Sequence, residues 1–173
     1  MTLREYLDSL KDKTVAVIGI GVSNTPLLRL LLREKIRVTA CDKRDRAALG
    51  ALAEELEKDG CRLQLGEDYL RGLDQDVIFR TPGLRPDVPE LLAAAERGSE
   101  ITSEMEVFFK VCPCTLIAVT GSDGKTTTTT IIAELLKGTP FMWAGISAIL
   151  CCVRQTKCRQ GTMRCWSSPA SSL

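Results

Sequence analysis

The chain has 173 residues, enough for one large domain or slightly more, and its 45% hydrophobic and 26% charged residues are typical of a soluble globular protein. The net charge of +1 gives no reason to expect nucleic acid as a partner, and no apolar run approaches the roughly 20 residues that a membrane span needs. Histidine is absent, which excludes Ser-His and Cys-His nucleophile pairs and His-ligated zinc for the chain acting alone. We therefore expect a cytoplasmic monomer that makes no contact with membranes or nucleic acid.

Residues 1 to 137 alternate between short apolar runs and amphipathic stretches, which predicts alternating strands and helices. Strands are expected at residues 14–18, 36–42, 63–65, 76–79 and 100–102, and helices at 25–34, 46–58 and 88–97. A second unit begins with a strand over 115–120, followed by a loop and a helix over 125–137. Repeated alternation favours an α/β fold, here a Rossmann-like doubly wound parallel sheet with helices on both faces.

The first strand runs into a glycine loop, Gly19-x-Gly21-x-x-Asn24. Glycines let the backbone approach a phosphate closely, and the helix that follows offers unpaired N–H groups. Asp42 ends the second strand, where a carboxylate meets a ribose or base in such folds. Asn24 replaces the third glycine of the dinucleotide-binding pattern, which argues against ordinary NAD use. The alternative that the glycines only form a tight turn stays open.

The second unit carries the stronger motif, T-G-S-D-G-K-T-T over residues 120–127, between an apolar strand and a helix. It departs from the strict phosphate-loop pattern because Val119 stands where that pattern has its first glycine. Gly124 permits close approach, Lys125 can reach the β- and γ-phosphates, and the Thr126 hydroxyl can bind Mg²⁺. Threonines 126–130 are poor helix formers, so we expect the first one or two to be retained for their hydroxyls.

Residues 138 to 173 differ in composition from the rest of the chain. They contain four basic residues and no acidic one, whereas residues 1 to 137 contain 19 basic and 22 acidic residues. They also hold four of the eight cysteines and lack the periodicity of a helix or strand. We expect this tail to be poorly ordered.

The phosphate-loop motif, the segment T-S-E-M-E-V-F-F over residues 102–109 and the T-P-G turn over 81–83 together resemble the muramyl peptide ligase family of peptidoglycan synthesis. The early G-x-G-V-S loop and the D-K-R strand end most resemble the members that add D-glutamate to UDP-N-acetylmuramoyl-L-alanine. The resemblance covers residues 1 to about 137. It implies an N-terminal UDP-sugar-binding domain and a central ATP- and Mg²⁺-binding domain. A third domain would supply D-glutamate, and the reaction would proceed through an acyl phosphate.

The resemblance also implies roles for individual residues. Lys125 would be catalytic and Thr126 would bind the metal ion. The residues that would bind ATP are Ser122, Asp123, Gly124, Lys125, Thr126 and Thr127. Those that would bind the UDP-sugar are Val22, Ser23, Asp42, Lys43, Arg44, Thr81 and Gly83. The domains expected are residues 1–111 for UDP-sugar, 112–137 for the start of a phosphate-loop ATP-binding domain, and 138–173 for a tail outside the family pattern.

The tail can be interpreted as the family sequence translated in a shifted frame. Back-translating residues 163–173 and reading from the third base of each codon permits A-V-L-E-L-S-S-F-Q-L. The same shift over residues 140–150 permits V-Y-V-G-G-N-I-G-N-P-L. Both resemble family motifs, whose glutamate would be the second metal ligand. The alternative is a native basic tail.

Three functions follow from these observations. The first is a truncated ATP-dependent ligase with little or no activity. The second is a non-catalytic UDP-sugar-binding module. The third is a Rossmann oxidoreductase, which the second loop and Asn24 argue against.

Overall fold

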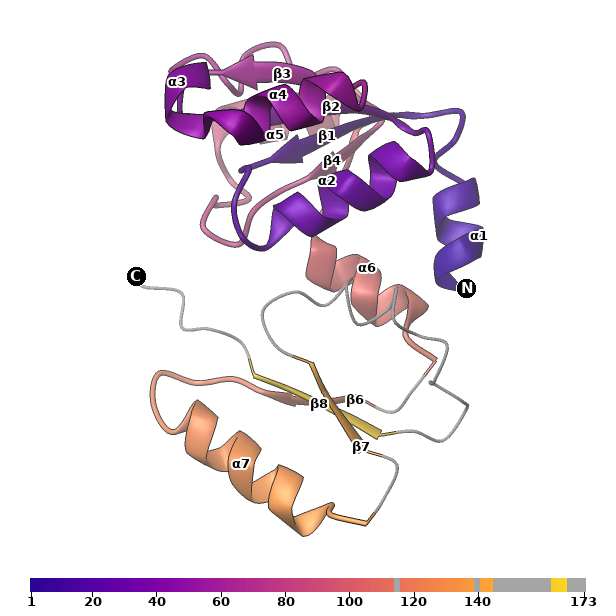
Figure 1. The fold of residues 1–173 in the computed structure, drawn as a ribbon, viewed down its shortest axis with the longest axis vertical. Helices are drawn as coiled ribbons and strands as arrows, with labels where there is room; N and C mark the ends of the chain where they lie inside the picture. The colour runs from indigo at the N-terminus through magenta and orange to yellow at the C-terminus, as the bar shows by residue number, and fades with distance from the viewer. Residues whose placement is uncertain (114–115, 139–140, 145–162, 168–173) are drawn as a thin grey trace.

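The computed structural model describes residues 1–113, 116–138, 141–144 and 163–167. Its first part is a five-strand sheet in the order β3-β2-β1-β4-β5 (Figure 1). The strands are β1 (Thr14–Ile18), β2 (Arg37–Asp42), β3 (Arg62–Leu65), β4 (Val77–Phe79) and β5 (Glu100–Thr102). All neighbouring strands are parallel, and the order reverses beside β1. The predicted doubly wound α/β fold is confirmed. The carboxyl ends of β1, β2 and β4 lie at one edge of the sheet, the edge at which ligands bind in folds of this class.

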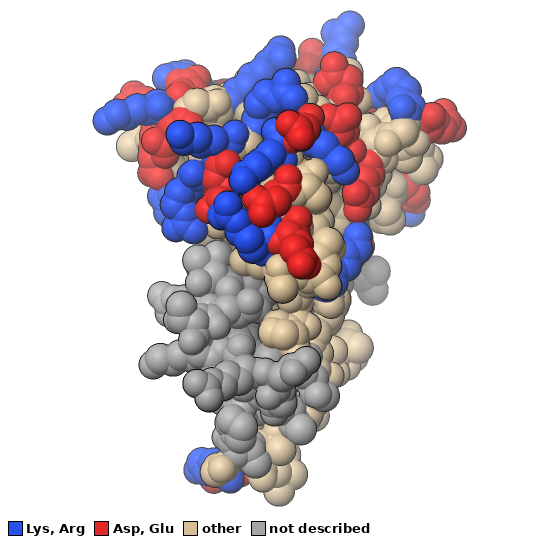
Figure 2. All heavy atoms as spheres, turned by 90° about the vertical axis from the view of Figure 1, so that its right-hand side faces the viewer, with Lys and Arg blue, Asp and Glu red and all other residues tan. Residues whose placement is uncertain are grey.

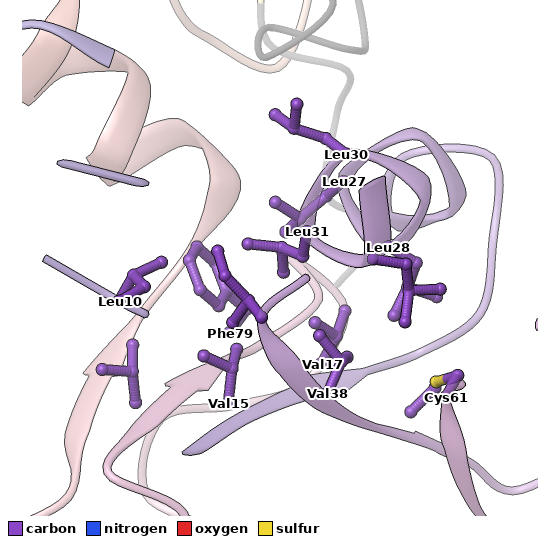
Figure 3. Close-up of a cluster of buried hydrophobic side chains, with 14 of the residues drawn as sticks. Leu10, Val15, Val17, Leu27, Leu28, Leu30, Leu31, Val38, Cys61 and Phe79 are labelled. Atoms are coloured by element: carbon purple, nitrogen blue, oxygen red, sulfur yellow. The ribbon is translucent and has the colours of Figure 1, made fainter. Parts of the chain in front are cut away.

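Helices cover both faces of this sheet because alternate residues of each buried strand are apolar on opposite sides. The helices are α1 (Leu3–Asp8), α2 (Asn24–Arg33), α3 (Arg46–Leu49), α4 (Ala51–Lys58), α5 (Pro89–Glu96) and α6 (Glu104–Val111). Val15 and Val17 share a core with leucines of α2 (Figure 3). That core also includes buried residues of α1, α4 and α6. Ile18 packs on the other face with Leu91 of α5.

Three helices differ from the sequence prediction. The helix expected over 46–58 is split into α3 and α4 because Gly50 has φ +54°, which ends the first helix. Helices α1 and α6 were not predicted, although each carries a capping signal. In α1 the Thr2 hydroxyl accepts from the Glu5 N–H, and the Glu5 carboxylate accepts from the Thr2 N–H. The Ser103 hydroxyl accepts from the N–H three residues later at the start of α6.

The second part contains β6 (Leu116–Val119), α7 (Lys125–Leu135), β7 (Phe141–Ala144) and β8 (Met163–Ser167). The three strands form a parallel sheet in the order β6-β8-β7. Strands β7 and β8 correct the expectation that the tail lacks strands. β8 pairs with both β6 and β7, and such pairing depends on distant partners that local periodicity does not reveal. The expected disorder and the frame-shift interpretation also concern the rest of the tail, which lies outside the described residues.

Helix α7 exposes much of its apolar side, as expected for a unit with little to pack on. Ile131 is 54% exposed and Leu135 is 78% exposed. Ile117 and Val119 of β6 are half-buried. Figure 2 shows acidic and basic side chains interspersed over the part built on the five-strand sheet. Among the described residues, no helix is both long enough and apolar enough to cross a membrane.

Candidate functional site

A cavity of about 370 Å³ lies at the carboxyl edge of the five-strand sheet. The loops that follow β1, β2 and β4 contribute most of its walls. It is lined by all seven residues that the sequence assigned to a UDP-sugar, namely Val22, Ser23, Asp42, Lys43, Arg44, Thr81 and Gly83. The structure therefore brings together residues that lie up to 61 positions apart in the chain, although nothing in their spacing along the sequence shows that they meet.

Asp42 is buried and connects two of these loops. Its Oδ1 accepts from the backbone N–H and Nε of Arg44, both at 2.9 Å. Its Oδ2 accepts from the backbone N–H of Ile20 at 2.7 Å and from Arg44 Nη2 at 2.8 Å. A carboxylate has about four acceptor positions, so these bonds occupy all of them. Asp42 thus holds the glycine loop and Arg44 in place.

The same contacts keep Asp42 ionised. Burial on its own raises the pKa of the Asp42 carboxyl, but the hydrogen bonds from Arg44 and Ile20 outweigh burial and lower the pKa to about 2. The Arg44 side chain remains 42% exposed. Its Nη2 also donates to the Ile20 carbonyl, while its Nη1 makes no hydrogen bond within the described residues. Arg44 is therefore fixed on one side and can donate to a ligand on the other.

The glycine loop has two distinct glycines. Gly19 has φ +88°, and a Cβ added there would lie 3.1 Å from Cβ of Thr81. Gly21 has no positive φ, and a Cβ at that position would meet no atom within 4 Å. Asn24, which replaces the third glycine, donates from Nδ2 to the Ile18 carbonyl at 2.9 Å and is buried. Gly19 is therefore required by the fold, Asn24 ties α2 to β1, and Gly21 leaves open space in the cavity wall.

We expect the Gly19→Ala variant to be less stable than the wild type by about 2 kcal/mol, because a side chain at positive φ is strained and Thr81 must also move. Gly21→Ala is the matched control in the same loop, with an expected change within about 0.5 kcal/mol. Urea unfolding followed by circular dichroism measures both. Equal stability of the two variants would contradict the importance assigned to the Gly19 contact.

The second loop precedes α7 and ends at Gly124, which has φ +72°. Residues 122–124 are exposed, and none of residues 122–127 lines the cavity described above. The Lys125 ammonium donates to the carbonyl oxygen of Gly121 and, at 2.9 Å, to that of Ser122. The amine therefore lies over the loop whose backbone would hold a phosphate.

The threonines that open α7 fall into two groups. The hydroxyls of Thr129 and Thr130 donate to the carbonyl oxygens of Lys125 and Thr126, at 2.7 and 2.9 Å. The Thr126 and Thr127 hydroxyls are exposed and make no hydrogen bond within the described residues. Thr126 thus fits a single oxygen ligand of Mg²⁺, an ion that keeps several waters and phosphate oxygens. No cluster of three or more metal-binding side chains occurs among the described residues.

Two residues that line the cavity were not predicted from the sequence. Tyr69 lies in the loop after β3, which carries no motif, and Leu84 directly follows the T-P-G turn after β4. The only available signal is positional, because loops that follow parallel strands meet at one edge of the sheet.

Comparison with known proteins gives one family. The curated relatives include UDP-N-acetylmuramoylalanine--D-glutamate ligase from Acetivibrio thermocellus, 50% identical over 145 residues, covering 83% of this chain and 31% of the relative. The enzyme of the same name from Clostridium botulinum (strain Kyoto / Type A2) is 52% identical over 143 residues, covering 82% and 31%. The chain thus spans about a third of the length of these relatives.

A solved structure, UDP-N-acetylmuramate-alanine ligase MurC from Thermotoga maritima, aligns with a TM-score of 0.47 and 25% identity over 72% of this chain and 29% of that chain. The family model described as "Mur ligase MurD-like, N-terminal domain" matches residues 13–103, a range that includes all five strands of the first sheet and all seven residues named for the cavity. The sheet, the cavity and this match lead to one conclusion: the chain belongs to the Mur ligase family through a MurD-like N-terminal domain.

Proposed function

We propose that this chain is the UDP-sugar-binding part, with the ATP phosphate loop, of an ATP-dependent ligase that adds D-glutamate to UDP-N-acetylmuramoyl-L-alanine. The observation that carries the proposal is the cavity of about 370 Å³, which gathers the seven residues at one edge of the sheet. The names of the relatives that are 50% and 52% identical support this substrate pair.

In this proposal each loop binds a different phosphate group. The N–H groups that open α2 receive no side-chain cap, so they and the open wall at Gly21 suit the diphosphate of the UDP-sugar. Arg44 suits the uridine end because its Nη1 is available for a ligand. The amides of residues 122–124 and the Lys125 ammonium suit the triphosphate of ATP.

The reaction proposed is a carboxylate activation followed by amide formation. A carboxylate oxygen of the UDP-sugar substrate attacks the γ-phosphorus of ATP, and ADP leaves. The D-glutamate amine then attacks the carbonyl carbon of the acyl phosphate, and phosphate leaves with loss of the amine proton. Lys125 offsets negative charge on the transferring phosphoryl group, and Thr126 would hold a Mg²⁺ ion that neutralises further charge.

Ligand-dependent thermal stability tests the proposal. UDP-N-acetylmuramoyl-L-alanine at about 100 times its Kd should stabilise the fold by about 2.7 kcal/mol and raise the Tm by several degrees. Mg-ATP should raise the Tm separately if the phosphate loop is formed. A rise with the UDP-sugar alone favours the second candidate, a non-catalytic UDP-sugar-binding module. No rise with the UDP-sugar contradicts both, and a rise with NAD(P) favours an oxidoreductase.

We also propose that the 173-residue chain alone has little or no ligase activity. It contains no histidine, and residues 138–173 contain no carboxylate that could act as a second metal ligand. A coupled assay of ADP release with ATP, Mg²⁺ and both substrates measures this, with a full-length relative as the positive control. Turnover near that of the control would contradict the proposed inactivity but leave the proposed substrates unaffected.

A further inference from the structure

The cavity has a neighbour on the far side of Tyr69. A second hollow of about 540 Å³ is lined by residues 67–74 together with residues of α5. Tyr69 is the one described residue that lines both this hollow and the 370 Å³ cavity. Tyr69 therefore lies where the two adjoin, and its side chain is half-buried.

The backbone around Tyr69 is tied to the floor of the cavity. The N–H of Gly66 donates to the carbonyl oxygens of Asp42 at 3.0 Å and Arg44 at 3.2 Å. The Gln64 side-chain amide donates to the carbonyls of Tyr69 at 3.1 Å and Arg71 at 2.8 Å, and the Asp68 carbonyl lies 3.4 Å from the same nitrogen. The side chain also packs against the core beneath α5. Tyr69 is thus held in position by contacts that need no ligand.

The surroundings of Tyr69 further favour the neutral phenol, the form that an ordinary tyrosine already has at pH 7. Burial raises the pKa of its phenol, and the carboxylates of Asp42 and Glu90 raise it further. The ring is consequently an uncharged aromatic surface close to Asp42. Because the four acceptor positions of Asp42 are occupied by Ile20 and Arg44, the carboxylate cannot accept another hydrogen bond without losing one of these. Recognition of a planar base at this end of the cavity therefore falls to neighbouring groups.

We propose that Tyr69 is a specificity-determining residue, an aromatic wall that closes the base end of the cavity and restricts it to a ring of pyrimidine size. The proposal rests on the proposed function, which places a uridine diphosphate in the same cavity. Its physical basis is twofold. An aromatic face stacks on any base and gains affinity from the contact. The position of the wall, between two hollows, sets how large a base can be before it meets the ring.

The test is the preference for UDP over ADP at this cavity in the intact 173-residue chain, measured by calorimetric titration of UDP alone and of UDP in the presence of saturating ADP. Competition counts only the ADP that occupies the UDP site, and not ADP bound at the phosphate loop. Tyr69→Ala removes the wall and joins the cavity to the 540 Å³ hollow. We expect UDP to bind roughly tenfold more weakly and the UDP-over-ADP preference to fall at least fivefold. Tyr69→Phe keeps the ring and should keep both values within about twofold. Tyr69→Leu repeats the test with an apolar side chain if the alanine variant does not fold.

A matched control is Arg71→Ala, since Arg71 lines the neighbouring hollow but not the cavity. It should leave the preference unchanged. Equal weakening of UDP and ADP in Tyr69→Ala and Tyr69→Leu would show a merely structural role and overturn the inference. Absence of UDP binding by the wild-type chain would instead overturn the proposed function, and the inference with it, so the two failures are distinguishable.

Discussion

The Asp42→Asn variant is expected to be less stable than the wild type by about 2 kcal/mol at pH 7. The carboxylate accepts four N–H groups, and an amide in its place presents its own NH₂ to donors from Arg44 or Ile20. A pKa lowered from 3.8 to about 2 corresponds to a similar free energy. Because this carboxylate holds the glycine loop, affinity for UDP should fall as well, by tenfold or more.

The dependence on pH distinguishes the charge from the shape of the side chain. A carboxyl whose pKa is lower in the folded than in the unfolded state stabilises the fold fully above about pH 5 and loses this contribution as pH falls toward 2. The stability difference between the wild type and Asp42→Asn should thus be constant from pH 5 to 7 and drop to about half by pH 3. Urea unfolding at these pH values measures it.

Asp12→Asn is the control for this experiment. Asp12 is exposed, and its carboxylate makes no hydrogen bond within the described residues. Its replacement should change stability by less than about 0.5 kcal/mol. If Asp42→Asn matched this control at pH 7, the hydrogen bonds assigned to Asp42 would not be important to the fold.

The Lys125→Met variant is expected to bind Mg-ATP about 10- to 100-fold more weakly while keeping its affinity for UDP. Methionine preserves the unbranched stem but removes the ammonium group, and a hydrogen bond to a charged group contributes about 1.5–3 kcal/mol. Since the ammonium donates to the carbonyls of Gly121 and Ser122, these bonds must be rearranged when it reaches a phosphate. Titration of Mg-ATP, followed by UDP, measures the two affinities.

Lys137→Met controls for the general loss of a positive charge. Lys137 lies just beyond the other end of α7 and pairs with Glu134. Its replacement should leave both affinities within about twofold of the wild type. Mg-ATP binding that is lost equally in the two lysine variants would indicate a nonspecific charge effect and contradict the role assigned to Lys125.

The positions of the five strands and their parallel arrangement could be predicted because short strand-like segments alternate with helical ones between turn signals. The split at Gly50 could not, since one glycine inside a helical pattern is usually tolerated and only its φ of +54° shows the break. Helices α1 and α6 were detectable in principle from the capping patterns at Thr2 and Ser103. Their hydrophobic periodicity is too short to indicate a helix without the cap.

The site residues were identified by motif and resemblance, and the motif could not show what each residue touches. Asp42 was expected against a ribose or base, and it does line the cavity, but its oxygens bond to the protein itself. Asn24 was seen only as a missing glycine, whereas its amide bonds to the end of β1. Tyr69 belongs to no motif, and its only signal was its position in a loop after a parallel strand. Such contacts depend on how loops from different strands meet, which is a property of the tertiary structure.

The short distance between Thr81 and a Cβ added at Gly19 restricts substitution at position 19 more than at position 81. A serine at position 81 removes the methyl group that lies 3.3 Å from the added Cβ, yet it keeps the Cβ of Thr81 at 3.1 Å. Threonine and serine at position 81 are therefore both compatible with glycine at position 19. Position 19 has no such freedom. Neither threonine nor serine at position 81 leaves room for a side chain there, and the φ of +88° still requires glycine. A change from threonine to serine at position 81 thus leaves the requirement for glycine at position 19 unchanged.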